Sequence, residues 1–122
     1  MPLQRILLVD DNAMFRSLAS RALEAAGFGV QALDPGSVFD VLKACLDFQP
    51  DLAIVDYHLP RCNAETLAVI LKEDPLYGHM KVLGISASHD PAMVQAMLDH
   101  GVDDFVFKGS MDSLVGAVRS LG

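Results

Sequence analysis

Short apolar runs rich in branched side chains recur along this chain, and longer segments with a helical period separate them. Most of the runs are continuous rather than alternating, a pattern typical of strands that are covered on both faces of a parallel sheet. The run that Gln31 interrupts is better suited to an edge strand. The predicted strands cover residues 6–9, 30–33, 52–55, 82–85 and 105–107.

The first segment between two runs, residues 13–26, has the pattern of an amphipathic helix. At about 100° per residue, its apolar and polar side chains fall on opposite faces, as in a helix that lies on a sheet. Gly27 follows as a C-terminal cap. The predicted apolar face holds Met14, Phe15, Leu18, Ala19, Ala22 and Ala26, and the predicted solvent face holds Arg16, Ser17, Ser20, Arg21 and Glu24.

Further helices are predicted where a residue suited to an N-cap precedes a helical pattern. Ser37, Asn63 and Ser110 have side-chain oxygens that can accept a hydrogen bond from the first turn. Asp90 precedes Pro91, which fits the first helical position because the amide that it lacks would be unpaired there anyway. The helices that begin at Ser37, Asn63 and Ser110 are expected to end near Leu46, Lys72 and Leu121.

Strands and helices that alternate in this way form βαβ units with right-handed crossovers, and therefore an α/β fold built as a three-layer sandwich. The length of 122 residues fits a single domain, residues 1–122. With 52% hydrophobic and 20% charged residues, the chain can bury a core and is expected to fold.

Charge, hydropathy and cysteine content exclude several classes of protein. The 9 basic and 16 acidic residues give a net charge of −7, which should repel nucleic acid. No apolar run approaches the roughly 20 residues that span a bilayer, and the first run meets carboxylates too soon for a signal peptide. Cys45 and Cys62 show no zinc-ligand spacing and suit a reducing cytosol. We therefore expect a cytoplasmic protein that contacts neither membrane nor nucleic acid directly.

Polar residues of related chemistry follow four of the predicted strands. Asp10 and Asp11 follow the first strand, and Asp56 follows the third. Ser86 and Lys108 follow the fourth and fifth strands. Taken singly, Asp11 or Asn12 fits a helix cap equally well. Because the carboxyl ends of parallel strands meet at one edge of the sheet, where ligands gather, the whole set predicts a functional site there.

The chemistry of such a cluster points to a metal ion and a phosphoryl group. Each close pair of carboxylates repels by roughly 4 kcal/mol at an effective dielectric of about 20, so protonation or a cation is needed. Hard oxygen ligands suit Mg²⁺, for which Mn²⁺ can substitute. A metal ion, the Lys108 ammonium and the Ser86 hydroxyl around Asp56 would stabilise a phosphoryl group in transfer to that carboxylate. The chain has no glycine-rich phosphate loop, so nucleotide binding is not indicated.

Four motifs in register resemble the receiver domain of two-component response regulators. They are LLVDDN at residues 7–12, LAIVDYHLP at 52–60, LGISA at 83–87 and DFVFK at 104–108, and together they cover essentially the whole chain. The resemblance implies a flavodoxin-like (βα)5 fold whose five-stranded parallel sheet has the order 2-1-3-4-5. It also implies phosphotransfer from a phosphohistidine on a sensor histidine kinase or on a phosphotransfer protein.

By this resemblance, Asp56 is the phosphoacceptor. Asp10, Asp11 and Asp56 hold Mg²⁺ together with the backbone carbonyl of His58. His58 and Ser88 lie two positions beyond the acceptor and the switch hydroxyl, where the family tunes the access of water to the acyl phosphate. That these two are plain surface residues is an equally open reading.

The resemblance also assigns residues that bind the phosphoryl group and respond to it. Lys108 pairs with the phosphoryl oxygens, and Ser86 and Ala87 lie at the motif that contacts the phosphoryl group. Ser86 is the switch hydroxyl, and Phe105 is the aromatic residue whose rotamer follows it.

The chain departs from the family pattern at four positions. Gly109 stands where a proline normally follows the lysine, so the family's cis peptide bond is expected to be missing. Ala64 replaces a usual glycine, Ser86 replaces the commoner threonine, and Phe105 replaces tyrosine. None of these changes removes a group that phosphorylation needs.

The helix that follows Pro91 carries a broad apolar arc of roughly 200°. Met93 and Met97 suit the core, whereas Val94 and Leu98, at the far edge, are candidates for an exposed patch that a partner covers. In the family, this helix forms the output and dimer face together with the fifth strand and the fifth helix. Val94, Leu98 and Phe105 are therefore the expected contacts of a downstream protein target, an effector domain or a second copy in a homodimer.

Three functions remain to be compared. The first is a phosphorylation-driven signalling switch rather than an enzyme with a substrate of its own. The second is a pseudo-receiver that only binds partners, for which Gly109 is the sole support because every acid and the lysine are present. The third is a small Mg²⁺-dependent phosphohydrolase, which would need a second acid and a cap over the substrate.

Overall fold

The structure is a computed structural model that describes residues 4–74, 76, 79–88 and 90–122. Strands and helices alternate through these residues, as the sequence predicts. The strands are β1 (Arg5–Val9), β2 (Gly29–Leu33), β3 (Leu52–Asp56), β4 (Lys81–Ser86) and β5 (Asp104–Phe107). The helices are α1 (Ala13–Ala25), α2 (Val38–Phe48), α3 (Ala64–Glu73), α4 (Pro91–Asp99) and α5 (Met111–Leu121).

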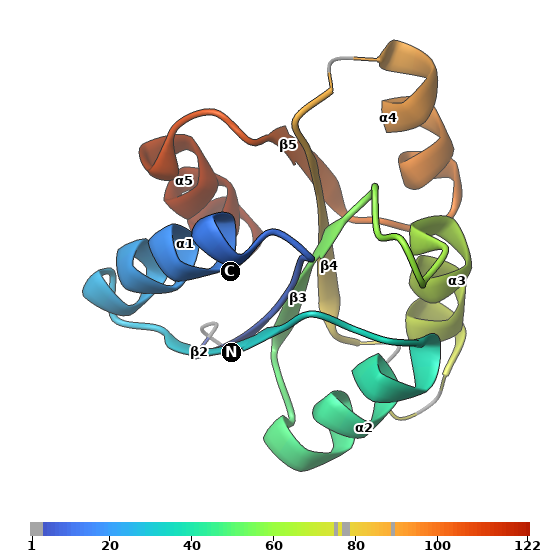
Figure 1. The fold of residues 1–122 in the computed structure, drawn as a ribbon, viewed down its shortest axis with the longest axis horizontal. Helices are drawn as coiled ribbons and strands as arrows, with labels where there is room; N and C mark the ends of the chain where they lie inside the picture. The colour runs from blue at the N-terminus through green and yellow to red at the C-terminus, as the bar shows by residue number, and fades with distance from the viewer. Residues whose placement is uncertain (1–3, 75, 77–78, 89) are drawn as a thin grey trace.

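All strand pairs are parallel, and the sheet has the order β2-β1-β3-β4-β5, which confirms the predicted order and the edge position of β2. Helices α1 and α5 cover one side of the sheet, and α2, α3 and α4 cover the other (Figure 1). The predicted three-layer α/β sandwich is therefore confirmed. In such a sheet every strand ends at the same edge, which is where the candidate site residues come together.

Each side of the sheet has its own hydrophobic core, because successive side chains of a strand point to opposite faces. Leu7 and Val9 of β1 pack toward α2 and α3, whereas Ile6 and Leu8 pack toward α1 and α5. All residues of β3 are buried, which explains why its sequence is a continuous apolar run rather than an alternating one.

The predicted apolar face of α1 is partly wrong. Met14 is 73% exposed and Leu18 is 48% exposed, whereas Ala19 and Leu23 are fully buried. The helix is rotated so that residues four apart, Phe15, Ala19 and Leu23, form the ridge that faces the sheet. The large side chains of Phe15 and Leu23 on this ridge fill the space beside the sheet.

Three of the four predicted N-caps are confirmed by hydrogen bonds. Asn63 Oδ1, Asp90 Oδ1 and Ser110 Oγ each accept a backbone N–H from the first turn of their helix. Ser37 precedes α2 but makes no side-chain capping bond; instead, the carboxylate of Asp40 accepts the N–H of Gly36 at 2.7 Å. That bond ties the loop before the helix to its first turn and leaves the side chain of Ser37 without a capping role.

Two helix ends show how local backbone geometry sets length. Gly27 adopts φ of 101° after α1, and the N–H of Phe28 bonds back to the carbonyl of Leu23, as in a Schellman cap. Helix α2 runs two residues beyond the predicted end at Leu46, because Gln49 stops it in the left-handed region at φ of 53°.

Among the described residues, no helix is both long and apolar enough to cross a membrane.

Candidate functional site

The carboxyl ends of β1 and β3 place two buried acids side by side. Asp10 follows β1 and is fully buried, and its N–H donates to the carbonyl of Leu33 at 3.0 Å. Asp56 is the last residue of β3 and is 3% exposed. Asp11 is exposed beside them. One carboxylate oxygen from each of these acids lies within 4.8 Å of the others, so the structure brings the predicted acidic cluster together.

The buried surroundings of Asp10 disfavour the charged form of its carboxylate. Its Oδ1 accepts the N–H of Asn12 at 2.8 Å. Its Oδ2 lies 2.7 Å from the Lys108 ammonium, yet accepts no hydrogen bond of good geometry from the described part of the chain. Burial raises the pKa of Asp10, the contact with Lys108 and the Asn12 amide work against this, and the charge of Asp56 adds to the rise.

Lys108 bridges the two buried acids. Its ammonium lies 2.7 Å from Asp10 Oδ2 and 3.1 Å from Asp56 Oδ2, and it also sits 4.6 Å from the centre of the Phe15 ring. Burial works to lower the pKa of Lys108, but its contacts with Asp10 and the charge of Asp56 outweigh burial and raise it. Lys108 is therefore a cation held between the carboxylates of Asp10 and Asp56 rather than a surface lysine.

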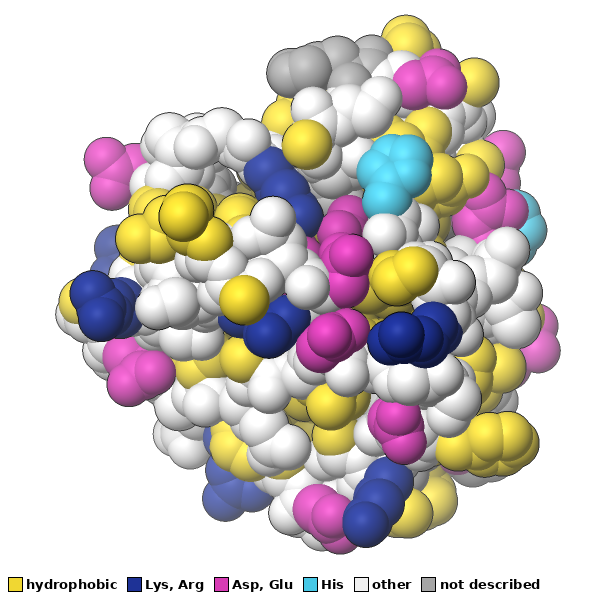
Figure 2. Space-filling view, viewed as in Figure 1, with side chains coloured by type: hydrophobic (Ala, Val, Ile, Leu, Met, Phe, Trp, Pro, Cys, Tyr) yellow, Lys and Arg dark blue, Asp and Glu magenta, His cyan; other side chains and the backbone are white. Residues whose placement is uncertain are grey.

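Asp56 is buried but faces an open hollow. Its Oδ1 accepts the backbone N–H of His58 at 3.2 Å. Figure 2 shows acidic side chains near the middle of this face of the molecule, with basic side chains and a histidine around them. The hollow has a volume of about 470 Å³ and is lined by Asp11, Asn12, Ala13, Asp56, His58, Ala87 and Lys108. A phosphate-sized group can therefore approach Asp56 from solvent.

Ser86 and Ala87, the residues predicted to contact the phosphoryl group, lie at or next to this hollow. Ser86 ends β4, is fully buried and accepts the N–H of Ser88 on its Oγ at 3.0 Å. The N–H of Lys108 donates to the carbonyl of Ser86 at 2.9 Å, which ties the loop after β4 to the lysine. Ala87 lines the hollow. The Lys108–Gly109 bond is trans, as expected without the family's proline.

The predicted output residues lie on α4 and β5. Leu98 is 40% exposed, and Val94 and Phe105 are half-buried. Met93 and Met97 are buried, which confirms their predicted place in the core.

Sequence reasoning missed two residues that shape the site, Arg16 and Phe15. Arg16 was placed on the solvent face of its helix, but its Nη1 donates to the carbonyl of Asp10 at 2.8 Å. Phe15 lies under the Lys108 ammonium. Asn12 caps α1, as one reading of the sequence expects, and also donates its N–H to Asp10.

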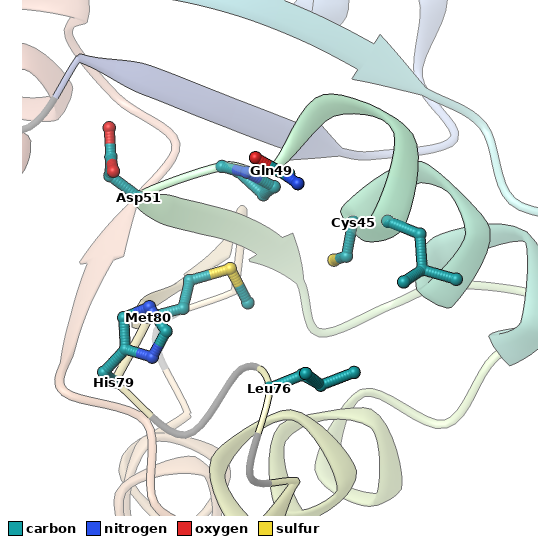
Figure 3. A pocket seen from close by; sticks show the side chains of 8 residues that line it. Cys45, Gln49, Asp51, Leu76, His79 and Met80 are labelled. Atoms are coloured by element: carbon teal, nitrogen blue, oxygen red, sulfur yellow. The ribbon is translucent and has the colours of Figure 1, made fainter.

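A second hollow of about 370 Å³ lies at the opposite, amino-terminal edge of the sheet. Side chains from α2 and from the segments before β3 and β4 converge on it (Figure 3). The carboxylate of Asp51 there already accepts the N–H groups of Gln4 and Arg5, both at 2.9 Å. Cys45, also in its lining, is a buried thiol whose pKa burial raises to about 11, so it is not a reactive group.

The donor set of the acidic cluster fits a hard divalent cation. It consists of carboxylate oxygens without histidine or thiolate, and the buried Asp10 Oδ2 has an unmet capacity to accept. Such an ion would offset the charge that burial and Asp56 make unfavourable at Asp10.

Comparison with known proteins defines the class to which this site belongs. The sequence profile of the response regulator receiver domain matches residues 6–119. The chain therefore belongs to the receiver domains of response regulators, which act in two-component signalling.

The relatives found by sequence are longer proteins. The chain is 30% identical over 118 residues to the DNA-binding response regulator MtrA of Mycolicibacterium paratuberculosis, a match that covers 96% of the chain and 50% of MtrA. It is 31% identical over 103 residues to the phosphate regulon transcriptional regulatory protein PhoB of Pseudomonas aeruginosa, which covers 84% of the chain and 44% of PhoB. The chain thus spans about half the length of these curated relatives.

Solved structures agree on the fold. A putative response regulator from Chloroflexus aurantiacus superposes with a TM-score of 0.88 at 25% identity, over 99% of this chain and 98% of that one. The chemotaxis response regulator CheY4 of Vibrio cholerae superposes with a TM-score of 0.87 at 18% identity, over 98% of this chain and 99% of that one. The predicted flavodoxin-like fold is therefore confirmed.

Proposed function

We propose that this chain is a phosphorylation-dependent signalling switch that accepts a phosphoryl group on the carboxylate of Asp56. The observation that carries the proposal is the placement of the Lys108 ammonium 3.1 Å from Asp56 Oδ2, at the floor of an open acidic hollow. A carboxylate that is buried, reachable from solvent and paired with a cation is suited to receive a group that brings negative charge.

The phosphoryl donor in this proposal is a phosphohistidine on a sensor histidine kinase or a phosphotransfer protein. A carboxylate oxygen of Asp56 attacks the phosphorus, and the new P–O bond forms as the P–N bond of the phosphohistidine breaks. The electron pair of that bond stays with the imidazole, which then takes a proton from solvent. The ammonium of Lys108 neutralises charge on the phosphoryl oxygens during the transfer.

Asp10, Asp11, Asp56 and the backbone carbonyl of His58 would hold Mg²⁺, or Mn²⁺ in its place. When bound, the ion supplies positive charge beside the transferring group. The residues themselves set the geometry. The amide of Asn12 orients Asp10 through Oδ1, and Arg16 fixes the backbone at the same position through its carbonyl.

The residues expected to respond to phosphorylation lie on β4 and β5. The Ser86 hydroxyl moves from Ser88 toward a phosphoryl group on Asp56, next to which Ala87 leaves space. Phe105, half-buried on the neighbouring strand, holds the place of the aromatic residue that the family's switch couples to this hydroxyl.

His58 and Ser88 control the access of water to the acyl phosphate. His58 lines the hollow and packs edge-to-face on Tyr57, with ring centroids 5.1 Å apart. Replacing His58 with Ala opens the hollow, so we expect a shorter half-life of the phosphorylated form. An unchanged half-life in this variant and in Ser88→Ala would contradict these roles.

The output is a protein contact on the face formed by α4, β5 and α5, where Leu98 is exposed and Val94 and Phe105 are half-buried. A downstream target, an effector domain or a second copy of the chain covers this face. The acidic net charge of −7 favours protein partners over nucleic acid, and we place the protein in the cytoplasm, where a sensor kinase presents its phosphohistidine.

The experiment that tests this function is intact-mass analysis after incubation with a small phosphoryl donor, with and without Mg²⁺. We expect a Mg²⁺-dependent gain of one phosphoryl group from acetyl phosphate, whose acetate leaves as the bond to Asp56 forms. Phosphoramidate, which carries a P–N bond as phosphohistidine does, serves as the second donor. No gain from either donor would contradict the proposal and favour a pseudo-receiver that only binds partners.

A further inference from the structure

Gly84 lies in β4 directly opposite Phe105 of β5, on the side of the sheet that α4 covers. A Cβ atom on Gly84 would lie 2.7 Å from Cδ2 and 3.2 Å from Cε2 of the Phe105 ring, and 3.1 Å from Cε of Met97. Carbon atoms in contact pack at about 3.5–4.0 Å. The Phe105 ring therefore occupies space that any other residue at position 84 would need.

The Phe105 ring has no room to shift sideways in its place beside Gly84. It packs edge-to-face on the ring of Phe107, with centroids 5.8 Å apart and planes at 75°. It also packs against the buried cluster that contains the fully buried Met97. The methyl end of Met97 can swing aside, but the atoms of an aromatic ring move together. A side chain at position 84 would therefore turn the Phe105 ring out of this seat.

The seat is on the same strand and the same face as the switch hydroxyl. Ser86 lies two residues beyond Gly84, so both point to the α4 side of the sheet. The register pairs Gly84 with Phe105 and Ser86 with Phe107. The Phe105 ring thus packs against β4 two residues before Ser86, on the same face of the sheet.

We propose that Gly84 is a positioning residue for the switch. By lacking a Cβ, it seats the Phe105 ring between β4 and α4 in the unmodified chain, so that phosphorylation of Asp56 changes the ring position little. The consequence rests on the proposed function: a partner that reads the α4–β5 surface meets nearly the same aromatic arrangement in both forms. Gly84 therefore favours, already in the unmodified chain, the conformation in which the Phe105 ring packs between β4 and α4.

The methyl group of Met97 reports on the seat, because it and the Phe105 ring lie against the same point of β4. The experiment is NMR of the chain labelled with ¹³C at the methionine methyl groups, without phosphate or donor. Phe105→Leu removes the ring current and so identifies its effect on the Met97 resonance. We expect Gly84→Ala to move this resonance in the same direction. Gly116→Ala is the matched control, because a Cβ there meets nothing within 4 Å, and it should leave the resonance in place.

The second arm adds acetyl phosphate and Mg²⁺ to the wild-type chain. We expect a smaller movement of the Met97 resonance than Gly84→Ala produces. The proposal is overturned if Gly84→Ala leaves the resonance unmoved, or if the wild-type resonance becomes ring-shifted only after phosphorylation. A wild-type chain that takes up no phosphoryl group by mass contradicts the proposed function instead, and leaves the comparison of unmodified variants intact.

A double variant guards against a Gly84→Ala chain that fails to fold. Phe105→Leu shortens the residue that the new Cβ meets, so we expect Gly84→Ala combined with Phe105→Leu to be more stable than Gly84→Ala alone. A double variant that is no more stable would show that the ring does not fill the seat, and the proposal would fail.

Discussion

At the scale of single residues, Asp10 and Lys108 stabilise each other's charge in a buried place. The ammonium of Lys108 lies 2.7 Å from Asp10 Oδ2, yet burial and the neighbouring Asp56 still raise the pKa of Asp10. A raised pKa means that the ionised carboxylate is less favourable in the folded chain than in the unfolded one. At neutral pH, the ionised carboxylate of Asp10 therefore lowers the free energy of unfolding, as is common for residues that function requires.

The first prediction follows from this charge. Asp10→Asn should raise the free energy of unfolding at pH 7 in a chelator by roughly 1 kcal/mol, because the amide removes a desolvated charge that repels Asp56. Urea denaturation measures it. Asp47→Asn, an exposed acid on α2, is the matched control and should change the free energy by less than about 0.5 kcal/mol. An Asp10→Asn chain less stable than wild type would contradict the argument.

The second prediction concerns the buried thiol of Cys45, whose pKa is raised from 9.0 to about 11 by burial. A pKa raised on folding gives stability that is complete below the unfolded value and is lost as pH rises through the folded value. Between pH 9 and 11, wild type should lose stability relative to Cys45→Ala by up to about 1.4 kcal/mol per pH unit.

Urea denaturation of both chains across this pH range measures the difference, and other groups that titrate there cancel in the comparison. Curves that run parallel with pH would show that the thiol ionises as easily in the folded chain as in the unfolded one.

The sequence predicts the residues that carry chemistry better than those that support them. Asp10, Asp56 and Lys108 could be found because each directly follows an apolar run that predicts a strand. Phe15 and Arg16 could not, because their roles depend on the rotation of α1 about its axis. An ammonium over a ring and a guanidinium on a carbonyl leave no pattern in a single sequence.

At the scale of elements, the helix caps show where sequence signals are sufficient. Asn63 and Ser37 both precede a helix and both belong to residue types that favour the N-cap. Of the two, only Asn63 caps its helix, by accepting the N–H of Thr66 at 2.9 Å. The Ser37 side chain makes no capping bond, and the carboxylate of Asp40 bonds the N–H of Gly36 before the helix instead. A residue of a capping type predicts where the helix starts, but whether its side chain makes the capping bond depends on the local conformation that the structure adopts.

The third prediction uses this pair. Asn63→Ala should lower the free energy of unfolding by about 1 kcal/mol, the usual value of a lost capping bond. Ser37→Ala should have little effect, because no capping bond is lost. Chemical denaturation of the two variants beside wild type tests the difference, and equal losses in both would contradict the assignment of caps.

The apolar face of α1 shows the limit of periodicity at this scale. A helical period identifies an amphipathic helix, but Met14 and Leu18 carry apolar side chains that the sheet does not cover. Which ridge faces the sheet is decided by fit against α5 and the strands, where Leu23 packs fully buried. That fit depends on residues far away in the sequence.

At the scale of the whole molecule, the parallel sheet is what assembles the site. Because β1, β3, β4 and β5 all end at one edge, residues distant in the sequence meet there without any local signal between them. Asp10 and Lys108 come from opposite ends of the chain and are 2.7 Å apart. Alternating apolar runs and helical segments are enough to predict this architecture. The ring seat at Gly84 is not predictable in this way, since it exists only once β4, β5 and α4 have packed.

The central claim is that Asp56 accepts a phosphoryl group, and the most direct test compares three chains by intact mass after incubation with acetyl phosphate and Mg²⁺. We predict a gain of one phosphoryl group by wild type and by Asp47→Asn, whose carboxylate is exposed on α2, and no gain by Asp56→Asn. Phosphorylation of Asp56→Asn to the same extent as wild type would place the acceptor elsewhere and contradict the account.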